Sequence, residues 1–338
     1  MKKIFGTFLF SALLALLPWS WALAQSTLDL AKKEGKVDWY SSASLPLSTK
    51  VCDLFNSKKL GIECNLHRDG SGQLYSRYVQ EARAGIYTAD VFHTSSIGHF
   101  ITLAANGELA KYQPQGTGQV DKNFLDKDGF WSVVRASVYI PVYNTTKVKE
   151  NEVPKSWLDF SDPKWSGKLV HAHPNYSGFV SEGLSALVKK FGWEIMDKFA
   201  AAKPRIVQSA IDTTTFVVRG EAHMSMGGTG YEPFVQMQKG EPIKFIYLQE
   251  GVPFIISPTA ILAKAPHPNA AKVFSDFLFS REAQQLMANT GLYVANPNVE
   301  YPKEMVPLKN VRLLPLSPED AVKMRKPVAE NFRQKFGV

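Results

Sequence analysis

Residues 36–92 have the sequence KVDWYSSASLPLSTKVCDLFNSKKLGIECNLHRDGSGQLYSRYVQEARAGIYTADVF, and this stretch decides the fold. The apolar runs at 36–40, 61–66 and 89–92 are short enough for strands. Helical patterns fill the intervals between them, the first running through Leu54 and the second covering 73–84. Strands that alternate with helices at this spacing predict βαβ units and a largely parallel sheet. The expected fold class is α/β.

A second series of the same kind begins after a long extended run at 131–143, which is expected to be one strand. It comprises expected strands at 167–171 and 222–226 and expected helices at 178–191 and 231–238. A further extended run at 253–263 precedes two adjacent helices at 269–279 and 281–289. The two long extended runs therefore bracket the middle third of the chain.

The simplest topology makes these two long runs the hinge between two lobes. The chain leaves the first lobe near Val138 and returns to it near Phe254. Lobe 1 is therefore expected to hold residues 25–138 and 254–338, and lobe 2 residues 139–253. Ligands of open α/β sheets bind beyond the carboxyl ends of the strands, so we expect a ligand cleft between the lobes.

The first 24 residues have the features of a cleaved signal peptide. A basic start at residues 2–3 precedes an apolar run at 4–17 and the small-residue site Ala-Leu-Ala at 22–24. Signal peptidase recognises this arrangement, so the mature chain is expected to begin at Gln25. A membrane anchor is the alternative, but Pro18 interrupts the apolar run and no stop-transfer segment follows. The expected location is the periplasm.

The charge pattern does not indicate a nucleic-acid partner. The formal net charge is +8, which favours anionic partners only weakly. The basic residues are scattered singly or in pairs such as Lys58-Lys59, without the interleaved aromatic residues that stack on bases.

Cys52 and Cys64 are the only cysteines of the chain. They would close a small loop between a helix and a strand, and in an oxidising compartment two cysteines so placed are expected to form a disulfide. A catalytic thiol is the alternative, but that role calls for a histidine partner and no second cysteine nearby.

Enzyme motifs are absent from the sequence. There is no G-x-S-x-G, H-E-x-x-H, G-x-x-x-x-G-K-[ST] or C-x-x-C. We expect no enzymatic activity, and a periplasmic hydrolase remains the alternative of another class because spatial triads leave no sequence motif.

Several stretches in the expected order resemble the solute-binding proteins of ABC importers. The resemblance is to the two-lobed class that includes ferric-ion, phosphonate, sugar-phosphate and thiamine binders. The most specific stretch is WLDFSDPKWSGK at 157–168. The other matching pieces are Tyr40-Ser41-Ser42, Gly70-Ser71-Gly72 with Glu81 in the helix that follows, Ala89-Asp90-Val91, Pro154 to Ser156, Gly220-Glu221-Ala222, His267 to Lys272 and Phe274 to Gln284.

This resemblance implies the type II periplasmic-binding-protein fold. It also implies a monomeric receptor without a cofactor, which captures a small solute by hinge closure and hands it to an inner-membrane ABC permease. Members of the class bind chemically different solutes, so the resemblance does not choose the ligand.

In lobe 1, the candidate ligand-binding residues follow the ends of strands. They are Ser41, Ser42, Arg68, Ser71, Gly72, Thr94 and Ser95. Hydroxyls and backbone N–H groups at a helix start bind anionic groups, and glycines allow close approach to the backbone. For the serines, an ordinary helix cap is the alternative. His93, beside Thr94, is expected only to pack.

In lobe 2, the candidates lie in three polar segments. They are Tyr176, Ser177, Thr213, Thr214, Thr229 and Tyr231. The last two belong to a glycine-rich turn whose amides can hold an oxyanion, although core packing is the alternative for Tyr231. His171 and His173 share one face of a strand, but no third ligand lies nearby, so no metal site is expected.

These residues favour an oxyanion such as a phosphate ester, a phosphonate or a carboxylate. Four helix starts and many hydroxyls face the cleft without a cluster of carboxylates, and Arg68 and Arg135 are available as charge partners. For both arginines, a salt bridge at the surface or the hinge is the alternative. A ferric ion is the alternative. The ferric-binding relatives carry two adjacent tyrosines where this chain has Gly230-Tyr231, and Tyr231 would be the metal ligand in that case.

Overall fold

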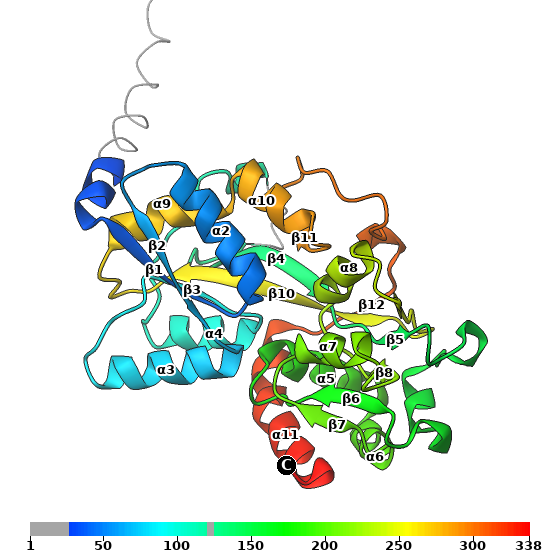
Figure 1. The fold of residues 1–338 in the computed structure, drawn as a ribbon. Helices are drawn as coiled ribbons and strands as arrows, with labels where there is room; N and C mark the ends of the chain where they lie inside the picture. The colour runs from blue at the N-terminus through cyan, green and yellow to red at the C-terminus, as the bar shows by residue number, and fades with distance from the viewer. Residues whose placement is uncertain (1–26, 120–124) are drawn as a thin grey trace, which may run out of the picture.

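The computed structural model describes residues 27–119 and 125–338 and has two lobes, each built around its own β-sheet (Figure 1). The expected signal peptide lies outside the described residues. Within the described ranges, none of the helices combines the length and the apolar character that crossing a bilayer requires. The α/β fold class is confirmed.

The first sheet has seven strands in the order β11-β4-β10-β3-β1-β2, with β12 paired to β10. The strands are β1 (Lys36–Ser41), β2 (Glu63–Arg68), β3 (Val91–His93), β4 (Ser132–Val138), β10 (Val252–Ile261), β11 (Tyr293–Val294) and β12 (Leu313–Leu314). β1 pairs in parallel with both β2 and β3, as the βαβ pattern of residues 36–92 predicts. β10 runs antiparallel to β3 and β4.

Helices cover both faces of this sheet. They are α2 (Leu45–Ser57), α3 (Ser71–Arg83), α4 (Ile97–Ala105), α9 (Pro268–Leu278) and α10 (Arg281–Ala288). Alternate residues of a strand point to opposite faces, so Val37 and Trp39 join one apolar cluster with Phe274 of α9, whereas Tyr40 joins another with Phe100 of α4. Burial on both faces fixes the register of β1.

A disulfide joins Cys52 of α2 to Cys64 of β2. The pairing predicted from the sequence is therefore confirmed. It ties α2 to the edge strand of the sheet.

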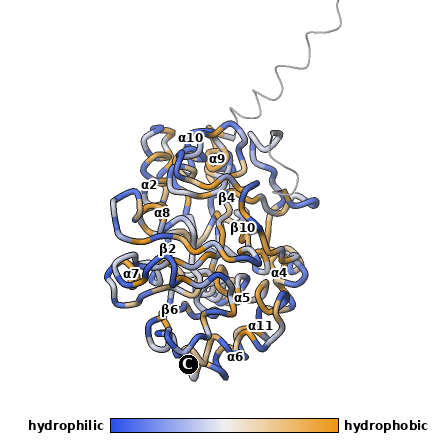
Figure 2. The backbone as a smooth tube through the Cα atoms, turned by 90° about the vertical axis from the view of Figure 1, so that its right-hand side faces the viewer, coloured by the Kyte–Doolittle hydropathy of each residue, from blue (hydrophilic) through white to orange (hydrophobic). Residues whose placement is uncertain are grey.

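The second sheet has five strands in the order β7-β6-β8-β5-β9. They are β5 (Val142–Asn144), β6 (Leu169–Ala172), β7 (Arg205–Val207), β8 (Met224–Ser225) and β9 (Ile243–Phe245). The accompanying helices are α5 (Gly178–Phe191), α6 (Glu194–Ala201), α7 (Asp212–Val218) and α8 (Tyr231–Gln238). Figure 2 shows apolar stretches of chain in the interior of the molecule and polar ones at its edges.

The motif at 157–168 forms two short 3₁₀ helices, Trp157–Ser161 and Pro163–Trp165. Ser156 and Asp162 cap them, each accepting a backbone N–H two residues on. The Trp157 side chain is fully buried and its indole Nε1 donates to Gly251 O at 2.9 Å. The motif therefore fixes the segment through which the chain returns to the first sheet.

The chain crosses between the sheets twice. The run at 131–143 was expected to be one strand, which is wrong: it breaks into β4 and β5, because Pro141 has no N–H and the chain changes sheets there. The second crossing lies between β9 and β10, and Tyr139 N donates to Pro253 O at 2.8 Å where the two crossings meet. The boundaries 138/139 and 253/254 stay predictions.

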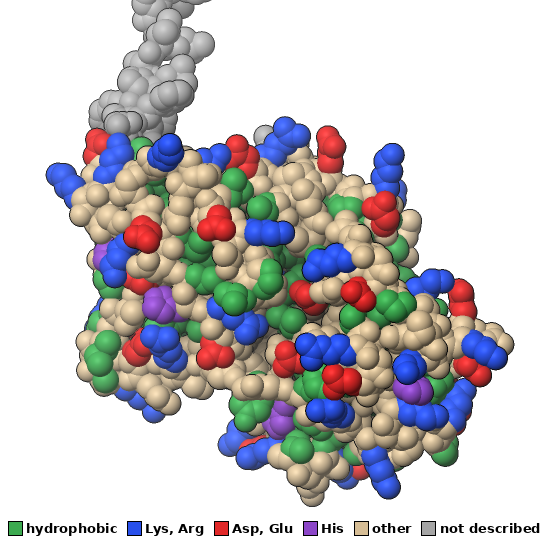
Figure 3. Space-filling model, in the orientation of Figure 1, with side chains coloured by type: hydrophobic (Ala, Val, Ile, Leu, Met, Phe, Trp, Pro, Cys, Tyr) green, Lys and Arg blue, Asp and Glu red, His purple; other side chains and the backbone are tan. Residues whose placement is uncertain are grey.

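The last helix, α11 (Pro318–Phe336), packs against α4 of the first lobe and α5 and α6 of the second (Figure 1). Its Val328 and Phe332 are buried in the same cluster as Trp157. Placing all of residues 254–338 in lobe 1 therefore stays a prediction. Figure 3 shows basic and acidic side chains interspersed over one face of the molecule.

Candidate functional site

A small cavity lies between the two lobes, lined by loops and helix starts of both. Its lining residues are Ser42, Arg68, Gly70, Ser71, Ser95 and Arg135 of lobe 1 and Tyr176, Ser177, Phe179, Ser209, Ala210, Ile211, Thr229 and Tyr231 of lobe 2. The cavity volume is about 30 Å³, which is close to the space of one water molecule. An organic solute can therefore enter only when the lobes move apart.

Helix N-termini surround this cavity. Ser71 begins α3, Tyr231 begins α8, and Ser177 is the N-cap of α5, where its hydroxyl accepts the Val180 N–H at 3.3 Å. The first N–H groups of a helix have no intrahelical partner and carry partial positive charge. Together these termini favour an anionic group in the cavity.

Arg135 of β4 brings a buried positive charge to the cavity. Its side chain is 2% exposed, and no acidic group among the described residues forms an ion pair with it. Burial lowers its pKa, but a guanidinium stays protonated at any physiological pH. A buried charge without a counter-charge is costly, so this site is electrostatically incomplete.

Neutral groups hold the Arg135 guanidinium in place. Its Nε donates to His93 Nε2 at 2.9 Å and its Nη2 to Ser95 Oγ at 3.4 Å. His93 Nδ1 in turn donates to Pro258 O at 2.9 Å, which fixes the tautomer with a free Nε2 acceptor. Burial, reinforced by Arg135, lowers the pKa of His93 well below its usual value, so the imidazole is neutral.

Arg68, at the carboxyl end of β2, is the second cation of the lining. Its Nε donates to Ala43 O at 3.0 Å. The described lining residues include no aspartate, glutamate or histidine. The cavity therefore carries two positive charges and no negative one.

Two hydroxyls of lobe 2 complete the polar lining. Tyr231 accepts the Ser44 N–H of lobe 1 at 3.0 Å, and burial raises its pKa, so the phenol keeps its proton as a donor. Thr229 Oγ1 is buried and has no hydrogen-bond partner among the described residues. Such an orphaned hydroxyl is rare in native structures and fits a group that a ligand satisfies.

The structure brings most of the predicted site residues to this cavity. Those that line it are Ser42, Arg68, Ser71, Ser95, Tyr176, Ser177, Thr229 and Tyr231. Arg135, considered as a charge partner, also lines it. Whether these residues bind a solute stays a prediction.

The remaining predicted residues lie just behind the lining. Ser41 Oγ bonds to Ser48 Oγ, Thr94 Oγ1 bonds to His99 Nδ1, and Thr213 Oγ1 donates to Ala210 O. Thr214 is buried beside Thr213 in α7. Gly72 faces lobe 2 directly, because its backbone N–H donates to Tyr176 O at 3.4 Å.

Sequence reasoning missed one segment of the lining, residues 209–211. This loop precedes α7 and contributes Ser209, Ala210 and Ile211. The three threonines that follow it drew attention to the right place, but none of them is among the lining residues. Phe179, in the first turn of α5, also lines the cavity, and the sequence gives no indication of this beyond its position two residues after Ser177.

The lobes are in contact around the cavity. A Cβ built on Gly178 of α5 would lie 2.6 Å from Ser96 Cβ and 3.2 Å from Ser71 Cβ, and one on Gly72 would lie 2.1 Å from Asn175 O. Side chains at these positions would overlap the opposite lobe. The described conformation is therefore closed.

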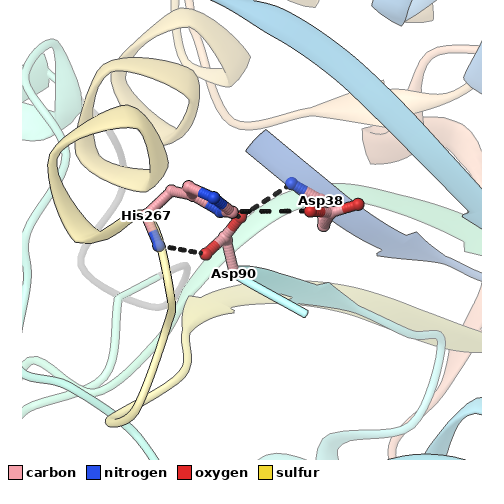
Figure 4. A group of neighbouring side chains, drawn as sticks. All are labelled: Asp38, Asp90 and His267. Carbon is pink, nitrogen blue, oxygen red and sulfur yellow. Dashed lines mark hydrogen bonds and ion pairs between the residues drawn. The ribbon is translucent and has the colours of Figure 1, made fainter. Parts of the chain in front are cut away.

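A second polar cluster lies away from the cavity, in lobe 1. Asp38, Asp90 and His267 are the group in the described part of the chain whose potential ligand atoms lie within 4.8 Å of one another (Figure 4). The Asp90 carboxylate accepts Asp38 N at 2.7 Å, His267 N at 2.7 Å and His267 Nδ1 at 2.9 Å. Lys36 Nζ lies 3.0 Å from Asp38 Oδ2. Because protein donors already occupy these oxygens, the cluster fits a structural anchor better than a cation site.

Replacing Asp90 with asparagine should lower the free energy of unfolding by about 1–2 kcal/mol, because an amide replaces one acceptor oxygen. Urea unfolding of D90N and the wild type measures the difference. Asp29→Asn, at an exposed position, is the matched control. A rise in melting temperature with Zn²⁺ that appears in the wild type and not in D90N would instead identify a metal site.

Comparison with known proteins places these features in a family. Residues 86–311 match the family described as bacterial extracellular solute-binding protein. The Fe(3+)-binding periplasmic protein of Serratia marcescens is 27% identical over 277 residues, covering 79% of this chain and 79% of that protein. Iron-bound HitA from Pseudomonas aeruginosa superposes with a TM-score of 0.77 at 25% identity, covering 89% of this chain and 99% of that one.

A third similar protein has a sugar phosphate bound, whereas the two above are iron-binding proteins. The periplasmic binding protein AfuA from Actinobacillus pleuropneumoniae, with exogenous fructose 6-phosphate bound, has a TM-score of 0.82 at 21% identity, covering 90% of this chain and 99% of that one. At this identity the likeness shows the fold alone. It is the two-lobed fold expected from the sequence.

Proposed function

Because this chain belongs to the bacterial extracellular solute-binding proteins, we propose that it is the periplasmic receptor of an ABC importer for a small organic anion. The solute class is a phosphate ester, a phosphonate or a carboxylate. The partner is an inner-membrane permease, to which a monomeric receptor delivers the solute. The relatives are binding proteins rather than enzymes, which supports capture without chemistry.

The unpaired charge of Arg135 is the observation that carries this proposal. Its guanidinium is buried beside Ser95 and lacks an acidic partner among the described residues. An anion seated in the cavity would supply the missing counter-charge. It would also accept hydrogen bonds from the Thr229 hydroxyl, Arg68 and the helix starts.

Hinge closure is the proposed mechanism of capture. The lining comes from both lobes, so a solute makes its full set of contacts only when they are closed. A ligand shifts a conformational equilibrium toward the state in which it makes more contacts. The open form admits the solute, and the closed form is the one that the permease recognises.

A ferric ion is the second candidate solute, because the relatives at 25–27% identity include iron binders. Hard trivalent ions require anionic oxygen ligands. The described lining offers no carboxylate, and Tyr231 is a protonated phenol beside Arg135. These features disfavour a cation at this cavity.

A thermal-shift screen of the mature chain tests the solute class. A ligand that binds only the folded state should raise the melting temperature. At a ligand concentration one hundred times its Kd, the free energy of unfolding increases by about 2.7 kcal/mol. We expect shifts with phosphate esters, phosphonates or small carboxylates, none with thiamine, and none with ferric citrate beyond the effect of citrate alone. Stabilisation by iron alone, with a coloured tyrosinate band, would overturn the anion proposal and make Tyr231 a metal ligand.

A further inference from the structure

Glu182 is a buried carboxyl group that the binding site does not use. It lies in the second turn of α5, and its side chain is 4% exposed. Its Oε1 accepts the backbone N–H of Ile97 at 2.7 Å. Ile97 begins α4, whose Phe100 belongs to a cluster of the first lobe. One carboxyl group therefore bridges the two lobes.

This contact lies at the place where α5 of the second lobe meets α4 of the first. Glu182 lies one turn along α5 from Gly178, whose Cα faces Ser96 and Ser71 of the opposite lobe. Ser96 and the Gly98 N–H also lie close enough to the carboxyl group to influence it. Separating α5 from α4 would remove the Ile97 N–H from Glu182 and admit water to the carboxyl group.

Burial of Glu182 without an ion pair favours its neutral form, whereas the Ile97 N–H at the start of α4 favours the carboxylate. No cation of the described chain forms an ion pair with it. Arg325 of α11 is the charged group that influences the pKa of Glu182, and its guanidinium lies 4.9 Å from the centre of the Tyr75 ring. His99 of α4 is neutral, because burial and then Arg325 lower its pKa. Burial raises the pKa of Glu182 to about 8, although its hydrogen bonds oppose this.

We propose that Glu182 enters the closed interface as a neutral carboxylic acid, so that solute capture takes up one proton. The acid can accept from Ile97 through one oxygen and donate to the Ser96 hydroxyl through the other. The inference rests on the proposed function in one respect, because it takes lobe closure to be the step that follows solute binding.

The pH dependence has a definite sign. A group with a raised pKa in the closed form favours closure fully below its ordinary pKa, and this contribution is lost as the pH rises to about 8. A solute should therefore bind more weakly as the pH rises through this window, by up to about tenfold per pH unit.

The test compares the wild type with Glu182→Gln, using fructose 6-phosphate as the probe at pH 5.5, 7.0 and 8.5. Glutamine is uncharged like the neutral acid, and its amide oxygen can accept the Ile97 N–H while its NH₂ group donates to the Ser96 hydroxyl, so E182Q should fold. The ratio of the wild-type Kd to the E182Q Kd should rise with pH. Titration of the phosphate group of the probe affects both Kd values equally and therefore cancels in this ratio. Calorimetric titration at pH 7.0 in buffers of different ionisation enthalpy measures the protons taken up on binding. The wild type should take up as much as one proton more than E182Q. Glu194→Gln, exposed on α6, should behave as the wild type.

Small-angle scattering without any ligand separates the two proposals. The wild type should open as the pH rises from 5.5 to 8.5, whereas E182Q should not. Identical pH responses of the two chains in both experiments would overturn the proton coupling. Absence of probe binding by both chains at every pH would exclude fructose 6-phosphate as the solute, and the scattering comparison would then decide the role of Glu182 alone.

Discussion

Arg135→Gln should weaken the binding of an anionic solute by about 2–5 kcal/mol, roughly 30- to 5,000-fold. The guanidinium is the buried charge of the cavity, and an anion is the partner that it lacks. Glutamine keeps an amide donor for His93 Nε2 and removes the charge. The stability of the unliganded chain should stay the same or rise, because an unpaired buried charge disfavours folding. Calorimetric titration and thermal unfolding of the two chains measure both effects.

The opposite changes in affinity and stability separate a binding role from a structural one. Arg205→Gln is the matched control, since Arg205 is exposed at 58% and its contacts with Glu221 and the Phe216 ring lie outside the cavity. It should leave the affinity unchanged. If R135Q bound the solute as the wild type does and melted at a lower temperature, Arg135 would be a structural residue and the anion proposal would lose its main support.

The position of Arg135 explains why sequence reasoning could name it only as an alternative to a hinge salt bridge. Site residues at strand ends follow a general rule of open sheets, and Ser42, Ser71 and Ser95 lie at the cavity as that rule predicts. Arg135 lies within β4, where every residue is buried. Its exposure to a ligand depends on how the two lobes meet, which no local pattern encodes.

The fold was more predictable than the site, because helices and strands leave periodic patterns. The expected helices at 178–191 and 231–238 coincide with α5 and α8. Helix α11 was not predicted: only Ala321, Val328 and Phe332 of its residues are buried, and Pro327 lies inside it. Its apolar face is thin because it packs across both lobes, and that arrangement is a property of the tertiary structure.

Gly72→Ala should weaken solute binding by up to about 3 kcal/mol, or about 150-fold, by preventing full closure. Gly72 lies in the first turn of α3, where its backbone suits any residue. In the closed form, however, a Cβ there would lie 2.1 Å from the backbone oxygen of Asn175 in the other lobe. A backbone atom cannot turn aside as a side chain can, so the lobes must stay apart.

The open form should tolerate the same change. Alanine is favoured over glycine in a helix by about 0.5–1 kcal/mol, so unliganded G72A should be as stable as the wild type. Gly98→Ala is the matched control, because its Cβ would meet its nearest atom at 3.6 Å and closure would be unaffected. With the solute present, scattering should show compaction of the wild type and G98A but not of G72A.

Together the two variants distinguish the two requirements of capture. R135Q removes the counter-charge and leaves the lobes free to close, whereas G72A keeps the charge and blocks closure. If charge alone held the solute, G72A would retain wild-type affinity, and the hinge mechanism would be wrong. If closure is required, each variant should lose affinity by itself, and the double variant should lose less than the sum, because a lobe that cannot close no longer brings Arg135 and Thr229 to the same ligand.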